Sequence, residues 1–393
     1  ATEEQLRDIH AAGYPPAIQE GALVVMASFN SWYGKKMHGN RELLQDVLVE
    51  RMGFDGFVVG DWNGHGQVAG CTNVSCAKAF NAGLDMFMAP DSWKNLYKNT
   101  LAQVKSGEIT MARLDEAVSR ILRVKLISGL FEAGLPSSRT YAGKFEQLGS
   151  APHRALAREA VRKSLVLLKN TNQLLPLMAK SKVLVAGSAA DNIGQQSGGW
   201  TLTWQGTGNK NSDFPNGESI FQGMASAVTS AGGQVELNEQ GQYSTRPDVA
   251  IVVFGEQPYA EFQGDVADLD FKAEDSLVIL KSLQAQGIPT VSVFLSGRPM
   301  WVNPEINASD AFVAAWLPGS EGGGVADLLF RDVQGQVRYD FSGRLSFSWP
   351  NTPLDVELNV GNAEYDPLFA YGFGLSVNEQ VQLANLNETL DPA

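Results

Sequence analysis

Several acidic residues follow apolar, strand-like segments of the chain. Asp61 comes directly after the run GFVVG and precedes Trp62 and the loop NGHGQ. The run VAIVVFGE leads into QPYAEFQGD, which offers Glu256, Glu261 and Asp265. Carboxylates that follow parallel strands lie at the edge where barrels and open sheets hold their ligands. Two of them, one from each segment, could act as nucleophile and general acid/base in the cleavage of a glycosidic bond.

Each of these acids also has a simpler interpretation. Asp61 could cap a turn or a helix, because aspartate is common in such positions at the ends of strands. The acids in QPYAEFQGD are equally compatible with solvated side chains on a loop. Position alone therefore makes these residues candidates and leaves both interpretations open.

Tryptophans lie in the loops beside the same segments. Trp62 follows Asp61 directly, and Trp200 and Trp204 lie in the glycine-rich stretch GGWTLTWQG. A tryptophan in such a loop offers a flat apolar face with an N–H donor, against which a sugar ring can stack. Four others are expected in a core or an interface: Trp32, Trp301, Trp316 and Trp349.

The sequence gives little support to metal, nucleotide or serine-hydrolase chemistry. The segments AGSAAD and SGGW lack the GxGxxG and Walker patterns, and no GxSxG elbow is present. Cys71 and Cys76 fit a short disulfide loop of a secreted or periplasmic protein as well as they fit two unpaired thiols. We expect no metal and no organic cofactor, and we expect His65 to be an exposed loop residue. The histidines lie scattered, without the spacing of metal ligands: His10, His38, His65 and His153.

The elements that must position these residues alternate between strands and helices. Short apolar runs at 21–30, 53–62 and 82–90 resemble strands of a parallel sheet that is buried on both faces. Helical patterns cover 40–52, 73–82 and 91–131. Three such strands cannot bury their faces alone, so residues 1–133 are predicted to be the C-terminal part of a (β/α)8-like barrel. The alternative is a small three-stranded layer packed directly on the second domain.

A second α/β domain is predicted to follow. Residues 134–153 lose the periodicity and gain Gly, Pro and Ser, which indicates a linker. The predicted domain spans 154–375, and 376–393 is a tail or the start of a further domain. It begins with an amphipathic helix at 154–169, and RLSFSWP at 344–350 is expected to add an edge strand. Buried strands and intervening helices are predicted at 182–188, 249–256, 290–297 and 311–319, and at 218–231, 273–287 and 322–330.

Charge and hydrophobicity exclude two classes of partner. The 393 residues carry 43 acidic against 30 basic side chains, a formal net charge of −13. An acidic chain without a basic run is not expected to bind nucleic acid. The longest apolar runs, such as AFVAAWL, are far shorter than the roughly 20 residues of a membrane span. Because the chain begins at Ala1 and not at a methionine, we expect the remaining barrel segment upstream of residue 1.

Taken together, GFVVGDWNG, GGWTLTWQG and GEQPYAE resemble glycoside hydrolase family 3, in its β-D-glucan exohydrolase and β-glucosidase branch. The stretches SFNSWYGKKMHGN, AGLDMFMAP, VAGSAADNIG, FLSGRPM and AAWLPGSEGGG support this resemblance in family order over residues 15–375. The resemblance implies a (β/α)8-like barrel followed by an α/β sandwich, with the active site between them. Asp61 matches the family's nucleophile, and Glu261, rather than Glu256, matches its acid/base.

The resemblance also implies a sugar-binding set. Trp62 and Trp204 match the pair that clamps the sugar in the outer subsite, and Met26 and Met88 match residues of the innermost subsite. Phe29 stands where a relative has tyrosine. Gln67 stands where plant relatives have an arginine, and the Asp, the Arg and the Lys-His pair that hold sugar hydroxyls in the family would precede residue 1.

The function implied is that of a retaining, exo-acting β-glucosidase or β-glucan exohydrolase. Such an enzyme releases glucose from the non-reducing ends of β-glucans and oligosaccharides, and retention requires carboxyl groups about 5–5.5 Å apart. A secreted or periplasmic location fits the acidic balance. The alternative is a noncatalytic carbohydrate-binding or sensor protein. A phosphosugar aldolase or isomerase would need phosphate-binding glycine loops, which the sequence lacks. The preference among β-1,3, β-1,4 and mixed linkages, and between gluco- and xylo-substrates, stays open.

Overall fold

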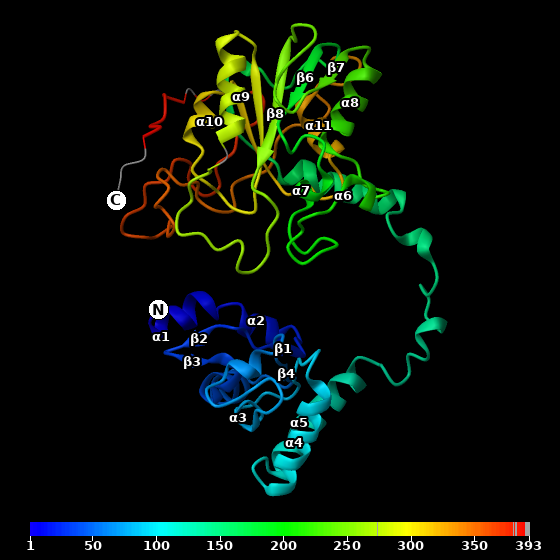
Figure 1. The fold of residues 1–393 in the computed structure, drawn as a ribbon, viewed down its shortest axis with the longest axis vertical. Coiled ribbons are helices and arrows are strands. Elements are labelled where there is room, and N and C mark those ends of the chain that lie inside the picture. Colours follow the sequence, from blue (N-terminus) through cyan, green and yellow to red (C-terminus); the bar gives the residue numbers. More distant parts are fainter. Residues whose placement is uncertain (273, 380, 382, 390–393) are drawn as a thin grey trace. The chain divides into compact units, whose positions relative to one another are not determined.

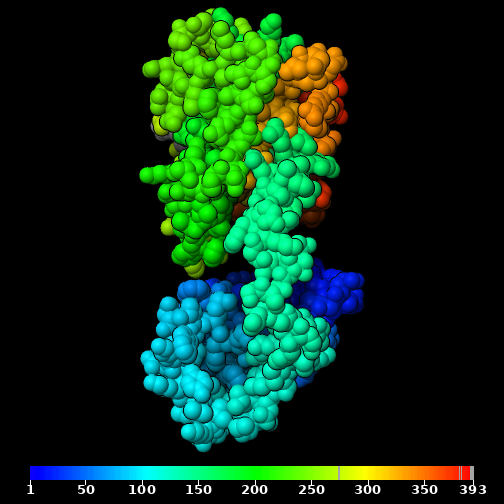
Figure 2. All heavy atoms as spheres, turned by 90° about the vertical axis from the view of Figure 1, so that its right-hand side faces the viewer, coloured from blue at the N-terminus to red at the C-terminus, as the bar shows by residue number. Residues whose placement is uncertain are grey.

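The computed structural model describes residues 1–272, 274–379, 381 and 383–389. The chain divides into two units, Ala1–Lys144 and Phe145–Ala393. Every residue from 131 to 149 is exposed, so neither unit buries this stretch (Figure 2). The division falls within the predicted linker. Among the described residues, no helix combines the length and the apolar composition that crossing a membrane requires.

The first unit is built on short parallel strands. Strand β1 (Val24–Met26) pairs in parallel with β4 (Phe57–Val59), and Met86 forms a parallel bridge to Val59. The predicted strands thus lie side by side, although 82–90 contributes one bridge instead of a full strand. The remaining elements of this unit (Figure 1) are α1 (Glu3–Gln5), η1 (Leu6–His10), α2 (Tyr14–Gln19), β2 (Ser31–Trp32), β3 (Lys35–Lys36), η2 (Met37–Gly39), η3 (Glu42–Arg51), η4 (Gly64–Gln67), α3 (Ala77–Asn81), α4 (Trp93–Ser106), α5 (Met111–Ile127) and η5 (Pro136–Ser138).

Two helices occupy the long helical pattern at 91–131. Helix α4 ends at Ser106, and its C-cap residue Gly107 adopts a left-handed φ of 81°. Helix α5 begins after Thr110, whose side chain accepts a hydrogen bond from the Arg113 N–H. Glycine at the C-terminus of one helix and threonine at the N-cap of the next are typical of helix boundaries. The pattern is therefore helical as predicted, but it is broken at 107–110.

A buried ion pair fixes α5 to the strands of this unit. The Arg113 guanidinium lies 2.7 Å from Asp85 Oδ1 and donates to the Phe80 and Leu84 carbonyls. Asp85 Oδ2 accepts a hydrogen bond from the Val58 N–H of β4 at 2.9 Å. The side chains of Arg113 and Asp85 are 12% and 1% exposed. Burial raises the pKa of Asp85, although these hydrogen bonds favour its charged form.

We expect Arg113→Met to lower the free energy of unfolding of this unit by about 3–5 kcal/mol, because it leaves the Asp85 carboxylate buried without its partner. An acid whose pKa is raised by folding destabilises the fold once it is ionised, so the loss should grow as pH rises. Amide hydrogen exchange at Val58 measures the effect within this unit. Arg123→Met on the same helix breaks only the exposed pair with Asp55 and should cost less than about 1 kcal/mol. Equal losses in the two variants would contradict the prediction.

The second unit contains a six-stranded sheet in the order β5-β10-β9-β8-β6-β7. All neighbouring pairs are parallel except β10 with β5, which is antiparallel. The strands are β5 (Val166–Asn170), β6 (Lys182–Ala186), β7 (Gln234–Leu237), β8 (Val249–Gly255), β9 (Thr290–Leu295) and β10 (Ala311–Trp316). The helices are η6 (Phe145–Gln147), α6 (Ala151–Ser164), η7 (Thr171–Gln173), α7 (Ile193–Ser197), η8 (Asn211–Asp213), α8 (Ile220–Ser230), α9 (Glu274–Ala285), α10 (Asn303–Asn307) and α11 (Gly323–Leu329).

Helices cover both faces of this sheet (Figure 1). Alternate residues of β5, β6, β8, β9 and β10 enter two separate cores, as Val183 and Leu184 of β6 illustrate. Helices α6, α8 and α11 line one core, and α9 and α10 line the other. The unit is therefore an α/β sandwich, as the alternation of strands and helices predicted.

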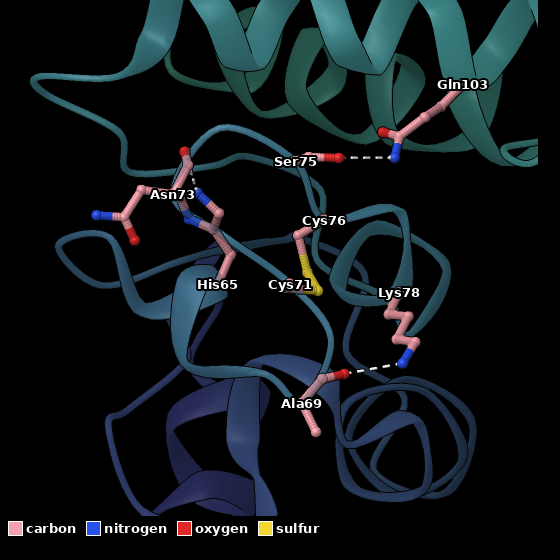
Figure 3. The surroundings of a disulfide bond; sticks show 8 residues. All are labelled: His65, Ala69, Cys71, Asn73, Ser75, Cys76, Lys78 and Gln103. Carbon is pink, nitrogen blue, oxygen red and sulfur yellow. Dashed lines mark hydrogen bonds between the residues drawn. A yellow bond between two sulfur atoms is a disulfide. The ribbon is translucent and has the colours of Figure 1, made fainter.

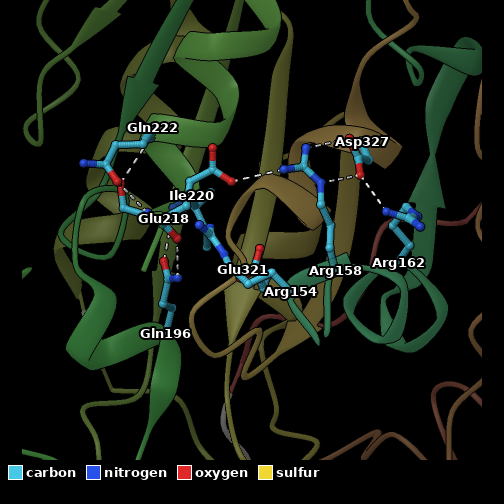
Figure 4. A network of polar contacts seen from close by, with 10 residues as sticks. Arg154, Arg158, Arg162, Gln196, Glu218, Ile220, Gln222, Glu321 and Asp327 are labelled. Carbon is cyan, nitrogen blue, oxygen red and sulfur yellow. Dashed lines mark hydrogen bonds and ion pairs between the residues drawn. The ribbon is translucent and has the colours of Figure 1, made fainter. Parts of the chain in front are cut away.

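A charged network ties α6 to α11 on one face (Figure 4). Arg158 donates to both oxygens of Asp327, at 2.8 Å each, and contacts Glu218 at 3.2 Å. Arg162 adds a second contact to Asp327, and Arg154 pairs with Glu321 at 2.8 Å. The network therefore connects α6 to two segments of the sandwich, the one around Glu218 and the stretch from Glu321 into α11.

Two predictions for this unit are wrong in detail, and one strand was missed. The helix predicted at 154–169 ends at Ser164, and the next residues form the antiparallel edge strand β5. The opposite edge strand, β7, was not predicted. Residues 344–350 form no strand of the sheet; Leu345 and Trp349 instead exchange backbone hydrogen bonds with 368–373. The edge that they were expected to supply is already formed by β5.

Candidate active site

Asp61 lies at the carboxyl edge of the parallel strands in the first unit. Backbone hydrogen bonds continue past the strands, from Ala27 N–H to the Val59 carbonyl and from Gly60 N–H to the Met86 carbonyl. Asn63 N–H then donates to the Met88 carbonyl at 2.9 Å. The strands thus deliver the segments around residues 26, 61 and 88 to one edge. This is the edge at which barrel enzymes hold their substrates.

A buried histidine fixes the backbone of Asp61. The Asp61 N–H donates to His38 Nε2 at 2.8 Å, and His38 is 1% exposed. Burial lowers the pKa of His38, which favours the neutral ring, and its Nε2 accepts the hydrogen bond from Asp61. A Cβ at Gly64 would overlap the His38 ring, so that position requires glycine. Sequence reasoning missed His38, because nothing in MHGN marks its ring as a partner of a residue 23 positions away.

The side chains beside Asp61 leave an apolar, accessible surface. Trp62 and Met26 are 57% and 50% exposed, and Phe29 and Met88 are less exposed. The Asp61 carboxylate accepts a hydrogen bond from the Trp62 N–H at 2.6 Å. The structure therefore brings Asp61 and Trp62 into direct contact and places Met26 and Met88 on neighbouring segments of the same edge.

The loop that follows is fastened by a disulfide bond (Figure 3). Cys71 and Cys76 are joined, which settles the alternative that the sequence left open. His65 is 1% exposed and lies 2.9 Å from the Asn73 carbonyl, so its expected exposure was wrong. Its ring packs edge-on against Phe87, which explains the burial. The loop after Asp61 is thus tied down by covalent and polar contacts.

Glu261 lies at an exposed position of the second unit, on the loop that follows β8. The indole N–H groups of Trp204 and Trp200 both donate to Glu261 Oε2, at 2.7 and 3.0 Å (donor to oxygen). These contacts hold the pKa of Glu261 below its ordinary value, and the hydrogen bond from Trp204 has the largest effect. Two tryptophans that the sequence marked as possible sugar platforms are therefore also the partners of the candidate acid/base.

Glu256 and Asp265 take different roles from Glu261. Two guanidinium nitrogens of Arg298 donate to Glu256 Oε1, at 2.6 and 3.0 Å. Tyr259 donates its hydroxyl to Glu256 Oε2 at 3.2 Å, and burial raises the pKa of Tyr259 to about 12. Asp265 is exposed further along the loop. Glu256 is engaged by a cation, whereas the Glu261 carboxylate is held by neutral donors.

Domain families match both units. The glycosyl hydrolase family 3 N-terminal domain matches residues 1–124, and the family 3 C-terminal domain matches residues 165–377. The chain belongs to glycosyl hydrolase family 3. The resemblance of the motifs is thereby confirmed, and so is the predicted fold class, a barrel-like domain followed by an α/β sandwich.

Solved structures and curated proteins extend this family 3 assignment. The chain is 55% identical to the exo-1,3/1,4-beta-glucanase (ExoP) of a Pseudoalteromonas species, with a TM-score of 0.98 over 100% of this chain and 49% of that one. It is 31% identical to the lysosomal beta glucosidase of Dictyostelium discoideum, over 95% of this chain and 48% of the relative. The periplasmic beta-glucosidase of Salmonella typhimurium is 29% identical over 95% of this chain and 55% of the relative. The family 3 chain thus spans about half the length of these relatives.

Proposed function

We propose that this family 3 chain belongs to a retaining, exo-acting β-glucosidase or β-glucan exohydrolase. The observation that carries the proposal is the environment of the Glu261 carboxylate, which two indole N–H groups hold at an exposed loop position. Asp61 supplies the second carboxylate, at the carboxyl edge of the strands in the other unit. The 55% identical exo-1,3/1,4-beta-glucanase supports the choice of substrate class.

The two carboxylates divide the chemistry between them. Asp61 attacks the anomeric carbon and forms a glycosyl-enzyme ester, while Glu261 gives a proton to the leaving oxygen. Glu261, now ionised, then takes a proton from water, and that water displaces Asp61 and releases the sugar with its configuration retained. The reaction requires no metal and no organic cofactor.

The indole contacts favour one of the two forms of Glu261. Hydrogen bonds from Trp204 and Trp200 stabilise the carboxylate, which is the form that the second step needs. Donation of a proton in the first step requires the protonated acid, so activity that depends on this step should fall as pH rises through the pKa of Glu261. The lowered pKa places that fall at a lower pH than an unbonded glutamate would.

Apolar side chains beside the two acids form the sugar-binding surface in this proposal. Trp62 and Trp204 stack against the sugar of the outer subsite, because both present exposed indole faces. Met26, Met88 and Phe29 line the innermost subsite. We place the domains as 1–133, a linker at 134–153, and 154–375. A secreted or periplasmic location is supported by the disulfide bond and by the periplasmic relative.

The test is hydrolysis of laminaribiose, cellobiose and an aryl β-glucoside, with proton NMR to identify the first anomer released. We expect β-glucose to appear first and to mutarotate afterwards. Release of α-glucose first would overturn the retaining mechanism. Binding of these sugars without turnover would instead indicate a carbohydrate-binding or sensor protein.

A further inference from the structure

A single turn supplies most of the contacts made by Glu261. This turn, residues 198–206, is called the tryptophan turn below. It closes on itself through a hydrogen bond from the Trp200 N–H to the Trp204 carbonyl at 2.8 Å. Trp200 and Leu202 have φ angles of 58° and 59°. Residues other than glycine rarely adopt this left-handed region, and they do so where the surrounding structure holds them in it. The tryptophan turn therefore has a fixed and unusual backbone.

The base of the tryptophan turn is tied to the sandwich by two buried glutamines of α7. The Gln195 amide donates to the Gly255 and Glu256 carbonyls at 3.2 and 3.1 Å, at the end of β8. The Gln196 amide donates to the Glu218 and Gly319 carbonyls at 3.0 and 2.6 Å (Figure 4 shows its contact to the Glu218 segment). The turn is thus attached to the same strand end from which the Glu261 loop departs.

Gln205 connects the tryptophan turn to the backbone of Glu261. Its Oε1 accepts a hydrogen bond from the Ala260 N–H at 2.7 Å, and its Nε2 donates to the Glu261 carbonyl at 3.2 Å. One side chain therefore binds the backbone of Ala260 and of Glu261 through both ends of its amide. Phe262, the next residue, has a φ of 72°. A non-glycine residue adopts this left-handed backbone at an energetic cost, which contacts on the neighbouring residues can offset.

Glycines allow the tryptophan turn and the Glu261 loop to pack so closely that a larger side chain would not fit. A Cβ at Gly199 would overlap the Tyr259 carbonyl oxygen, and one at Gly206 would overlap the Gly198 carbonyl oxygen. The backbones of the turn and the loop thus pack directly against each other just before Glu261. Gln205 joins them by polar contacts at Ala260 and Glu261.

We propose that Gln205 is a positioning residue for Glu261. By fixing the backbone at Ala260 and Glu261, it holds the carboxylate within reach of the Trp200 and Trp204 indoles and at a constant place on the loop. Its catalytic consequence rests on the proposed function, in which Glu261 moves protons. Its structural consequence, the geometry of the indole contacts, does not depend on that function.

The catalytic test uses the full-length protein and compares two substrates that differ in their leaving group. Gln205→Met keeps the volume of the side chain and removes both hydrogen bonds. We expect kcat/KM to fall about 10- to 100-fold for laminaribiose, whose leaving group needs a proton, and less than about threefold for 2,4-dinitrophenyl β-glucoside, whose leaving group does not. Gln284→Met, at an exposed position of α9, should match the wild type on both. An equal loss on both substrates, or no loss on laminaribiose, would overturn the proposal.

A second readout does not require activity. The indole N–H signals of Trp200 and Trp204 in a proton–nitrogen NMR spectrum should shift as pH falls through the titration of Glu261, and Glu261→Gln should abolish that shift. We expect Gln205→Met to reduce the shift of both signals by more than half. Gln205→Glu, which keeps the acceptor for the Ala260 N–H, should lie between Gln205→Met and the wild type in both experiments. Unchanged shifts in folded Gln205→Met or Gln205→Glu would overturn the positioning role.

The two experiments separate this inference from the function on which it rests. If the wild type hydrolyses neither substrate, the proposed function fails, and the indole shifts alone decide whether Gln205 positions Glu261. If the wild type is active and the indole shifts survive in Gln205→Met, the proposed function stands and the positioning role fails.

Discussion

Replacing Asp61 by asparagine is expected to lower kcat for β-glucoside hydrolysis by about 10⁴-fold or more, because no other group in the proposed mechanism can form the glycosyl ester. The change keeps the shape of the side chain. It also keeps the hydrogen bond from the Asp61 N–H to His38, since that contact uses the backbone. Binding of a slowly hydrolysed substrate should therefore survive, and calorimetric titration with laminari-oligosaccharides measures it.

Asp115→Asn is the matched control for this change, because Asp115 lies exposed on α5 of the same unit. It should leave both kcat and binding unchanged. If Asp61→Asn retained more than about one per cent of the wild-type kcat, Asp61 would not be the nucleophile. If it lost sugar binding as well as turnover, the variant would have disturbed the strand edge, and the loss of activity could not be assigned to chemistry.

The sequence predicted best those strands that are buried on both faces. Strands β8, β9 and β10 are almost unbroken apolar runs, since parallel strands between two helical layers face a core on either side. The edge strands escaped prediction for opposite reasons. Strand β7 reads QVEL and is partly exposed, so it carries no apolar run. Strand β5 continues the apolar spacing of α6, and only its antiparallel pairing with β10 turns those residues into a strand.

In the candidate site, too, features set by neighbouring residues were predicted, whereas contacts between residues far apart in the sequence were not. Asp61 and the acids after β8 became candidates because they follow apolar strands, which is a local pattern, and the family resemblance then singled out Glu261 among them. Their partners could not be found in this way. His38 lies 23 positions from Asp61, and Trp204 lies 57 positions from Glu261. The spacing of residues in the sequence predicts which side chains share a helix face or a strand face. It does not predict these contacts, because they form between separate loops. The burial of His65 was mispredicted for the same reason, since Phe87 covers it.

The second large effect is expected for Glu261→Gln. On laminaribiose or cellobiose, kcat/KM should fall by about 10²- to 10⁴-fold, because glutamine cannot give a proton to the leaving sugar. On 2,4-dinitrophenyl β-glucoside the first step needs no acid, so kcat/KM should change little. The second step still lacks its base, so kcat should fall, and the glycosyl-enzyme should accumulate as a burst of dinitrophenol.

The pH profile of Glu261→Gln provides an independent check. An acid must be protonated to act, so wild-type kcat/KM on laminaribiose should fall as pH rises through the lowered pKa of Glu261. Glutamine does not titrate, and the residual activity of the variant should lose this fall. Glu364→Gln is the matched control, because it removes an exposed carboxylate of the same unit and should keep both the rate and the profile. If Glu261→Gln kept the alkaline fall, another group would supply the proton. Glu256 would be a poor substitute, since two guanidinium nitrogens of Arg298 already donate to one of its oxygens.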